Sequence, residues 1–455
     1  MEFPVEKQWS LQQDRRGVAF LERAATFSAL GILSLLLIAV FPSPPFVCLI
    51  GLVALSCVNY FVGDRDVLYP GFMYTAVWAL VVGAFLVCPE EVDSLGWKSV
   101  AVFLAGGASF SLGSLIGNRP ILRANGDESR PLEIADSNAQ VRNALVFCTV
   151  VITLLFLIVI LKTAGGLLYL GLNLLIVLNG QGSPLADADS FSNAIILSGA
   201  LLPILTLWVL IMEEKRSWKI WLCVFCIAIF QALVARRGLV MVAFCGSVTL
   251  ILLKSKDRTI RKAGLPLSIA ALGIVVLMAV MSLTKYWVQG PNGTSPASGA
   301  WHYITGPLAA FDYYVEHPDE YADQPAAVFV QILTPLSRLG LIRYQNLVEV
   351  DGSALDRFVM VPFPANVYTA YKPYYHDFGA WGCFAAFALF GLVEGLLFYR
   401  ATHGGAIAAF FLAHLAGSLM FSTFDDNYHG FSRHLNVLVF AIGCFWLMKR
   451  VKVRL

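Results

Sequence analysis

Two adjacent arginine residues, Arg236 and Arg237, lie between two apolar runs with almost no loop to separate them. Two cations in so tight a turn repel each other unless water or an anion compensates their charge. A guanidinium group offers a planar fork of donors that suits phosphate, and it stays charged at any relevant pH. The pair therefore predicts a diphosphate clamp at a membrane surface, with snorkelling interfacial arginines as the plainer alternative.

Three further arginine residues are candidates for the same clamp. Arg338 and Arg343 lie five residues apart in a polar stretch, and Arg433 precedes the last apolar run. Residues five apart do not share one face of a helix cleanly, so at most one of the first two is expected to reach a site. A solvated surface position is the alternative for these residues.

The densest polar and aromatic segment of the chain runs from 362 to 382 and ends where an apolar run begins. Its candidate sugar-binding residues are Asn366, Tyr368, Tyr371, Tyr374, Tyr375 and Trp381. Aromatic rings stack on the apolar faces of sugars, while neighbouring polar groups bind the hydroxyls. An aromatic belt at a membrane interface would explain Tyr374 and Trp381 as well, but it explains Asn366 and Asp377 poorly.

Asp377, His302 and His376 are the candidate catalytic residues, because each could accept a proton from a reacting hydroxyl group. Asp377, which stands in the motif Asp377-Phe-Gly379, is the first choice. Its alternative role is to cap a helix that begins near Phe378, which is a common function of aspartate. Asp312 is a further candidate base.

The composition shows what kind of scaffold must position these residues. Hydrophobic residues make up 58% of the 455 residues and charged residues only 14%, whereas a soluble domain carries about 25% charged residues. The mean hydropathy is +0.71. The net charge of +2 gives no indication of nucleic-acid binding. The chain is therefore predicted to be an all-α polytopic membrane protein.

Apolar runs bounded by charged residues predict about twelve helices that cross a bilayer core of about 30 Å. They occupy 24–42, 45–62, 67–88, 97–116, 144–162, 193–212, 218–235, 238–253, 265–285, 378–399, 404–422 and 434–449. A shorter stretch at 165–179 is interrupted by glycine, so it is expected to lie at the membrane surface or to re-enter the membrane.

The distribution of positive charge predicts the orientation of these helices. With the N-terminus inside, 22 of the 32 Lys and Arg residues fall on the cytoplasmic side, so both termini are expected there. The resulting layout has a cytoplasmic segment 1–23, a nine-span region 24–285, a large outer loop 286–377, further membrane helices at 378–449 and a cytoplasmic tail 450–455. Short helices across the membrane surface are expected within the outer loop, for example at 326–341.

The pattern Asn366-Val-Tyr-Thr, followed by a tyrosine pair, Asp377-Phe-Gly379 and Gly382, resembles the signature of bacterial oligosaccharide repeat-unit polymerases of the Wzy type. The Arg-Gly step at 237–238, the roughly twelve spans and the single large loop late in the chain are also similar to that family. The similarity of layout covers most of the chain, whereas the motifs are confined to two short segments.

This resemblance implies a membrane glycosyltransferase with a GT-C-like fold in the bacterial inner membrane, and it makes the outer loop 286–377 periplasmic. The implied reaction polymerises undecaprenyl-diphosphate-linked oligosaccharide repeat units, such as those of the O-antigen of lipopolysaccharide, without a metal, a cofactor or a nucleotide sugar. The implied partners are the lipid-linked oligosaccharide, membrane lipids and a chain-length regulator protein, with no nucleic acid. The sugar and its linkage stay open.

Two other functions remain open. An O-antigen ligase also takes a lipid-diphosphate donor and has a large outer loop, but it transfers the sugar chain to a lipid A core. A flippase or transporter for lipid-linked oligosaccharides also has about twelve spans. No internal repeat is evident in the sequence, however, and such duplication is common in transporters.

Overall fold

The computed structural model describes most of the helices that the sequence predicts. The described residues are 40–88, 94–118, 139–163, 201–213, 218–234, 237–255, 258–264, 296–321, 328, 359–361, 364–365, 368–424, 437, 439, 442–443 and 446. The predicted spans 24–42 and 265–285, the stretch at 165–179 and the expected surface helix at 326–341 lie outside these residues, apart from 40–42 and 328. The predicted span 434–449 is described only at scattered positions.

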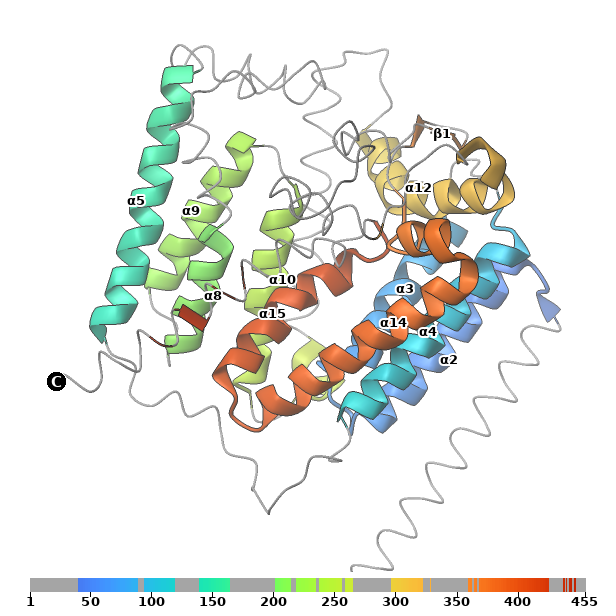
Figure 1. Ribbon diagram of the computed structural model, residues 1–455, viewed down its shortest axis with the longest axis horizontal. Coiled ribbons are helices and arrows are strands. Elements are labelled where there is room, and N and C mark those ends of the chain that lie inside the picture. Colours follow the sequence, from blue (N-terminus) through green and yellow to red (C-terminus); the bar gives the residue numbers. More distant parts are fainter. Residues whose placement is uncertain are drawn as a thin grey trace, which may run out of the picture.

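Helices dominate the described residues, as Figure 1 shows, and the one strand pairing is a short antiparallel bridge. The helices are α2 (Pro44–Val62), α3 (Pro70–Leu86), α4 (Trp97–Asn118), α5 (Ala139–Thr163), α8 (Leu202–Met212), α9 (Trp218–Val234), α10 (Arg237–Leu253), α12 (Pro296–Glu316), α14 (Lys372–Thr402) and α15 (Ala406–Phe421). A 3-10 turn, η3 (Pro318–Tyr321), follows α12, and β1 (Val359–Met360) pairs with β2 (Pro364–Ala365).

Four of the described helices are long and apolar enough to cross a membrane, namely α2, α4, α5 and α14. Shorter apolar helices, α3, α8, α9, α10 and α15, pack beside them. The predicted spans 45–62 and 97–116 agree with α2 and α4 within two residues at each end. The prediction of an all-α membrane protein is therefore confirmed.

The loops that the charge distribution assigned to one side of the membrane meet at one end of the structure. The Arg142 guanidinium lies 3.1 Å from the Glu213 carboxylate, and Lys219 donates to Asn143 over 2.8 Å. Nearby, Arg258 pairs with Asp66 at 2.7 Å. Burial raises the pKa of the Asp66 carboxyl, and the Arg258 charge opposes that rise. We call this the charged end of the structure.

The opposite end collects the loops that the sequence assigned to the other side. The Gly96 amide donates to the Asp312 carboxylate over 2.8 Å, and the Ala370 amide donates to the Ser422 carbonyl over 2.8 Å. In Figure 1, α12 and β1 lie at this end, above α14, α4, α3 and α2. We call it the loop end, because α12 and the β1–β2 bridge belong to the predicted loop 286–377.

The closest helix packing joins α4 to α14 through two glycine pairs that face each other. Gly113 and Gly117 on α4 and Gly391 and Gly395 on α14 are each spaced four residues apart. A Cβ atom at any of these positions would overlap backbone atoms of the other helix; at Gly391 it would overlap the Phe110 carbonyl. Small residues at this spacing let two membrane helices approach closely, so the four glycines fix the position of α14.

Buried aromatic rings fill the space between α14, α3 and α4. Tyr371 is fully buried, its hydroxyl lies 2.7 Å from that of Tyr74, and its ring packs on Trp78, Phe103 and Phe387. The Trp78 indole donates to the Ser422 hydroxyl over 3.0 Å, which ties α3 to the end of α15. This aromatic core supports the loop end from beneath.

Helix α14 is bent at Gly379, where the backbone has φ 63° and ψ −159°. The bend separates a short first segment, 372–378, from the long remainder, and Figure 1 shows this segment turned aside. From the exposed Trp381 to Arg400 the remainder spans about 29 Å at 1.5 Å per residue, close to a bilayer core. The predicted span 378–399 therefore corresponds to the part of α14 that follows the bend.

The bend depends on glycine at both Gly379 and Gly382. The Gly379 conformation is one that only glycine adopts readily. At Gly382 a Cβ atom would lie 2.6 Å from the Tyr374 carbonyl, because the first segment folds back over the second. The two glycines of the Asp-Phe-Gly pattern thus have a geometric role: they aim the first segment across the loop end.

We expect Gly379→Ala to destabilise the protein by about 1–3 kcal/mol, because alanine is strained in this conformation. A Cβ atom there would meet no heavy atom within 4 Å, so the whole effect comes from the backbone. Gly264→Ala is the matched control, since Gly264 has equally open space and no positive φ. Thermal unfolding of the purified variants in detergent measures the difference; equal melting temperatures would contradict the role of the bend.

Candidate functional site

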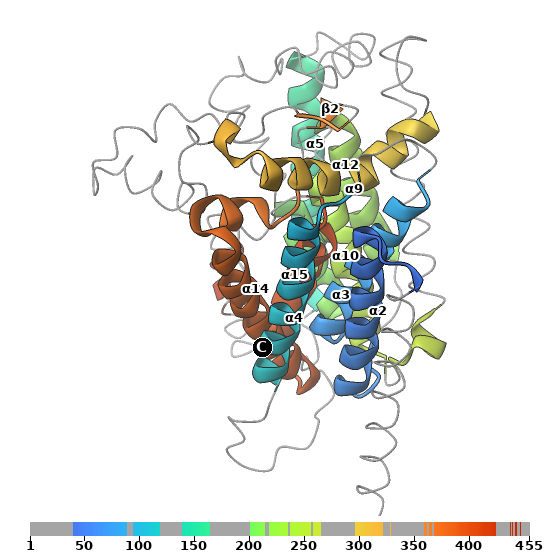
Figure 2. The ribbon, with the colours of Figure 1, turned by 90° about the vertical axis from the view of Figure 1, so that its right-hand side faces the viewer.

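Helix α12 lies across the loop end, roughly perpendicular to the helices beneath it, as Figure 2 shows. The middle of this helix is buried on all sides at 305–312, including Leu308, Ala310 and Phe311, whereas Glu316 at its end is exposed. The structure forms a helix within the predicted loop at 296–316, a position that the sequence analysis did not assign, and its place at a membrane surface stays a prediction.

Asp312 anchors α12 to the start of α4. Its carboxylate accepts the Gly96 amide hydrogen bond and is only 9% exposed. One turn further along α12, Glu316 pairs with Lys98 at 3.2 Å, in an exposed position where such a pair contributes little. The structure therefore gives Asp312, a predicted candidate base, a clear structural partner.

Asp377 holds the loop in a similar way. Its Oδ2 atom accepts a hydrogen bond from the Val328 amide over 2.7 Å, and the side chain is half-buried. The predicted alternative, a cap for a helix beginning near Phe378, stays a prediction, because the long part of α14 begins just after the bend at Gly379. The hydrogen bond to Val328 shows that the carboxylate reaches a distant part of the loop.

A hydrogen bond between two helices fixes the orientation of His376. Its Nδ1 atom lies 2.8 Å from the hydroxyl oxygen of Tyr314, which comes from α12 and is 3% exposed. The imidazole itself is half-buried. The Tyr314 ring also meets Tyr368 and Tyr375 edge-on, at centroid distances of 6.3 Å and 6.2 Å. His376 is therefore held by a buried partner that is itself packed on both sides.

Lys372 places a buried cation against the same rings. The side chain is 7% exposed, and its Nζ atom lies 3.6 Å from the Tyr368 ring centroid and 5.9 Å from that of Tyr314. An ammonium group over an aromatic face is attracted by the ring quadrupole, more strongly when it is shielded from water. We define Lys372, Tyr368, Tyr314 and His376 as the Tyr314 cluster.

The predicted sugar-binding residues fall into different environments. Tyr371 and Tyr374 are buried in the aromatic core, so they lack the open face that stacking on a sugar needs, and the structure gives them a packing role instead. Tyr368 is also buried, under Lys372. Tyr375 is half-buried and Trp381 is 81% exposed, so these two rings are open to a ligand. Asn366 lies outside the described residues.

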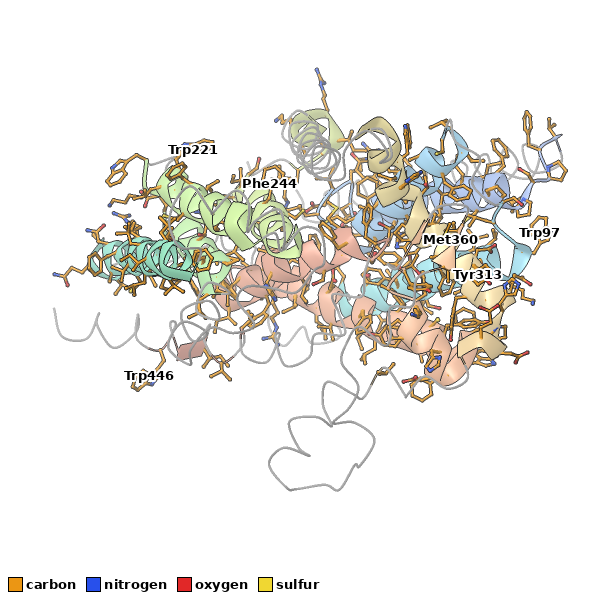
Figure 3. All side chains as sticks on the ribbon, turned by 90° about the horizontal axis from the view of Figure 1, so that it is seen from above. Trp97, Trp221, Phe244, Tyr313, Met360 and Trp446 are labelled. Carbon is orange, nitrogen blue, oxygen red and sulfur yellow. The ribbon has the colours of Figure 1, made fainter. Side chains whose placement is uncertain are left out.

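Exposed apolar side chains surround this end of the molecule. Trp97 is 57% exposed and Met360 is 65% exposed. Viewed from above in Figure 3, both lie on the same side of the molecule as Tyr313 of α12, away from Trp221. Exposed tryptophans at the ends of apolar helices are typical of the boundary between membrane and water. The Tyr314 cluster is therefore expected close to such a boundary.

Arg237 is the one predicted clamp residue within the described part of the chain, and it begins α10 at the loop end. Helices α10 and α15 run antiparallel, with Gly246 packed against Ala413. Arg237 lies nine residues before Gly246, and Ser422 lies nine residues after Ala413, so the two residues are at the same level. The Ser422 carbonyl accepts a hydrogen bond from the Ala370 amide. Arg237 thus begins α10 at the depth of the aromatic segment. Arg236, Arg338, Arg343 and Arg433 lie outside the described residues.

His302 lies apart from the other candidate bases. It is half-buried on α12, twelve residues before Tyr314, which is about 18 Å along a helix. Among the described residues, no group of three or more His, Cys, Asp or Glu side chains comes close enough to hold a metal ion. Tyr375, His376 and Asp377 follow one another on the first segment of α14, whereas His302 lies far along α12 from Tyr314, the partner of His376.

Sequence reasoning missed Lys372 and Tyr314 as members of the site. One signal was available for the start of the segment, since Lys372 is followed by proline, which is favoured in the first turn of a helix. No local signal pairs Tyr314 with His376, because 62 residues separate them. Their contact depends on how α12 docks.

The fold and the site together define a helical membrane protein with a polar and aromatic cluster at one end of its spans. Comparisons with family models, with curated proteins and with solved structures each found no match to the chain.

Proposed function

We propose that the protein polymerises undecaprenyl-diphosphate-linked oligosaccharide repeat units at the periplasmic face of a bacterial inner membrane. The observation that carries the proposal is the geometry of the segment 372–382, whose sequence resembles the polymerase signature. In it Gly379 and Gly382 form a bend, Asp377 holds the loop, and Tyr314 orients His376. The signature residues that the structure describes at 377–382 therefore belong to one local structure.

The proposed reaction transfers the nascent sugar chain from its lipid carrier to the next repeat unit. A sugar hydroxyl oxygen of the incoming unit forms a bond to C1 of the nascent chain, and the bond between C1 and the diphosphate oxygen breaks. The undecaprenyl diphosphate leaves with the bonding electron pair, and the hydroxyl proton passes to a base. Stabilising the leaving diphosphate and placing the hydroxyl are the two tasks of the protein.

The candidate residues divide between these two tasks. Five arginine residues are proposed to neutralise the diphosphate, since guanidinium groups do so without a metal. They are Arg236, Arg237, Arg338, Arg343 and Arg433. Trp381 and Tyr375 are open for stacking on sugar. His376 is proposed as the base. These assignments require the loop end to face the periplasm, with about twelve spans, both termini in the cytoplasm and a GT-C-like arrangement.

The test is a reconstituted reaction. The purified protein is mixed with a lipid-linked repeat unit, and the products are separated on a gel with and without a chelator. We expect a ladder of products that differ by one repeat unit, with the same intensity in both lanes. A wild-type protein that forms no ladder contradicts the polymerase proposal, and a ladder that the chelator removes contradicts a mechanism without metal.

Deletion of the gene separates the proposal from its two rivals. Loss of a polymerase leaves lipopolysaccharide capped with a single repeat unit. Loss of a ligase leaves finished polymer on undecaprenyl diphosphate, and loss of a flippase strands single repeat units on the cytoplasmic leaflet. Only the first pattern agrees with the proposal, so the lipid-linked and lipid A-linked fractions must both be analysed.

A pair of variants at Asp377 tests whether its carboxylate is a base or an anchor. Asparagine retains an oxygen that can accept from the Val328 amide, whereas alanine leaves that amide without its acceptor. We expect Asp377→Asn to retain most of its stability and polymer, and Asp377→Ala to lose about 1–3 kcal/mol of stability. Thermal unfolding and ladder length are measured for both. Loss of the ladder in a stable Asp377→Asn protein would instead make Asp377 the base.

A further inference from the structure

We infer that the hydroxyl groups of Thr369 and Thr423 bind a phosphate group of the lipid diphosphate at the loop end. This inference rests on the proposed polymerase function and adds two uncharged donors to the proposed arginine clamp. The observation that carries it is a pair of buried hydroxyl groups that have no hydrogen-bond partner among the described residues and that flank one hydrogen bond between two segments.

Burial without a partner sets these two hydroxyl groups apart. Thr369 is 1% exposed and Thr423 is 0% exposed, yet in the described part of the chain neither Oγ1 atom meets a donor or an acceptor. Thr305, a buried threonine in α12, instead donates to the helix carbonyl four residues earlier over 2.9 Å. The unpartnered hydroxyl groups of Ser114 and Thr206 lie within apolar helices rather than at the loop end. A buried polar group without a partner opposes folding, so its presence beside a candidate site indicates a partner outside the chain.

Backbone geometry holds the two threonines near each other. The Ala370 amide donates to the Ser422 carbonyl over 2.8 Å. Thr369 lies one residue before that amide, and Thr423 lies one residue after that carbonyl. The Trp78 indole donates to the Ser422 hydroxyl over 3.0 Å, which holds Ser422 in place. Both threonines lie in the connections that precede α14 and follow α15, so a ligand that reaches one hydroxyl is close to the other.

Positive charge at the same depth favours an anionic ligand. The Lys372 amide donates to the Thr369 carbonyl over 3.1 Å, so these two residues are the ends of one turn. The Lys372 side chain is 7% exposed and its ammonium lies over the Tyr368 ring, where it contributes charge to the turn. Arg237 begins α10 at the level of Ser422. Phosphate oxygens accept hydrogen bonds and carry negative charge, so they match two hydroxyl donors beside positive charge.

Thr369→Val and Thr423→Val each remove one hydroxyl group and keep the branched shape of the side chain. The measurement is the affinity of the purified protein in detergent for radiolabelled farnesyl diphosphate, which is a short lipid diphosphate. We expect each variant to bind it about tenfold more weakly, as for loss of one hydrogen bond to a charged group. Thr369→Ser keeps the hydroxyl and should bind as the wild type does. An affinity equal to that of the wild type in both valine variants would overturn the inference.

Competing compounds identify the part of the ligand that the site recognises. Inorganic diphosphate should displace farnesyl diphosphate from the wild type, whereas farnesol, which lacks the phosphate groups, should not. Tighter binding of farnesyl diphosphate than of inorganic diphosphate supports a lipid headgroup as the source of the phosphate. Equal binding of these two compounds, or displacement by farnesol, would overturn the assignment.

Thermal unfolding without ligand gives a readout of the opposite sign. Removal of an unsatisfied buried hydroxyl relieves a cost of folding, so both valine variants should melt at a higher temperature than the wild type. Thr305→Val is the matched control, because its buried hydroxyl already has a partner. Its melting temperature should not rise, and its affinity should equal that of the wild type. Lower melting temperatures in Thr369→Val and Thr423→Val would mean that the hydroxyl groups hold the fold, which contradicts the inference.

Binding needs no turnover, so the inference and the proposed function can fail separately. A wild-type protein that forms no ladder, while the valine variants lose affinity for farnesyl diphosphate, refutes only the polymerase. A wild-type protein that forms a ladder, while both valine variants keep full affinity, refutes only the phosphate site.

Discussion

Replacing Gly391 by alanine is expected to remove most of the folded protein from the membrane. The added Cβ atom would overlap the Phe110 carbonyl and crowd the Ser114 amide, which are backbone atoms that cannot rotate away. Helices α4 and α14 would have to separate. Overpacking of this kind costs about 1–3 kcal/mol and occasionally more, and here it acts on the helix that carries His376 and Asp377. Protein level in membranes and the elution profile in detergent measure the loss.

The same substitution at Gly83 is the control for this prediction. Gly83 also lies within an apolar helix, but a Cβ atom there would be 3.7 Å from a side-chain methyl of Leu49, which is an ordinary contact. Alanine is also favoured over glycine within a helix by about 1 kcal/mol. Gly83→Ala should therefore match or exceed the wild type. If the two variants behaved alike, the close packing of α4 on α14 would not determine stability.

Arg236→Ala and Arg237→Ala are each expected to lower polymerisation about a hundredfold, or to leave only short chains, while protein level stays unchanged. Removal of one preplaced donor to a developing negative charge typically has an effect of this size. The structure supports the position for Arg237, because α10 begins there at the loop end. Ladder length and initial rate measure the effect, and Arg237→Lys, which keeps the charge but loses the planar fork, is expected to be intermediate.

The control removes a cation from the charged end of the structure, on helix α9, which precedes α10 in the chain. Lys219 is the second residue of α9 at the charged end, where it donates to Asn143 in an exposed position. Lys219→Ala should leave chain length and rate unchanged. Chain length equal to wild type in both arginine variants would refute the diphosphate clamp, and an equal loss in all three variants would point to a general requirement for positive charge.

Much of the membrane-spanning architecture could be predicted from the sequence. The runs at 45–62, 97–116 and 218–235 agree with α2, α4 and α9 within a few residues, because apolar length is a strong and local signal. Cys223 and Cys226 lie inside the run 218–235 and are both buried, which agrees with the same signal. Local composition decides such features, so no knowledge of the partner helices is needed.

The site was predictable only in part. The segment 362–382 was identified by its density of polar and aromatic residues, and His376 was among the candidate bases. The separation of Tyr371 and Tyr374, which are buried, from Trp381, which is exposed, could not be read from the sequence. All three rings lie within eleven residues, so their exposure depends on the bend at Gly379 and on which side of α14 meets α4.

The sequence by itself determined that the chain crosses a membrane and that its polar and aromatic segment lies beside an apolar run, because hydropathy and charge act along the chain. Only the tertiary structure decided that α12 docks across the loop end, that Tyr314 meets His376, and that Asp377 holds Val328. These contacts join residues 49 and 62 positions apart, and they form only where helix packing brings the two segments together. Facing glycines on α4 and α14 set that packing.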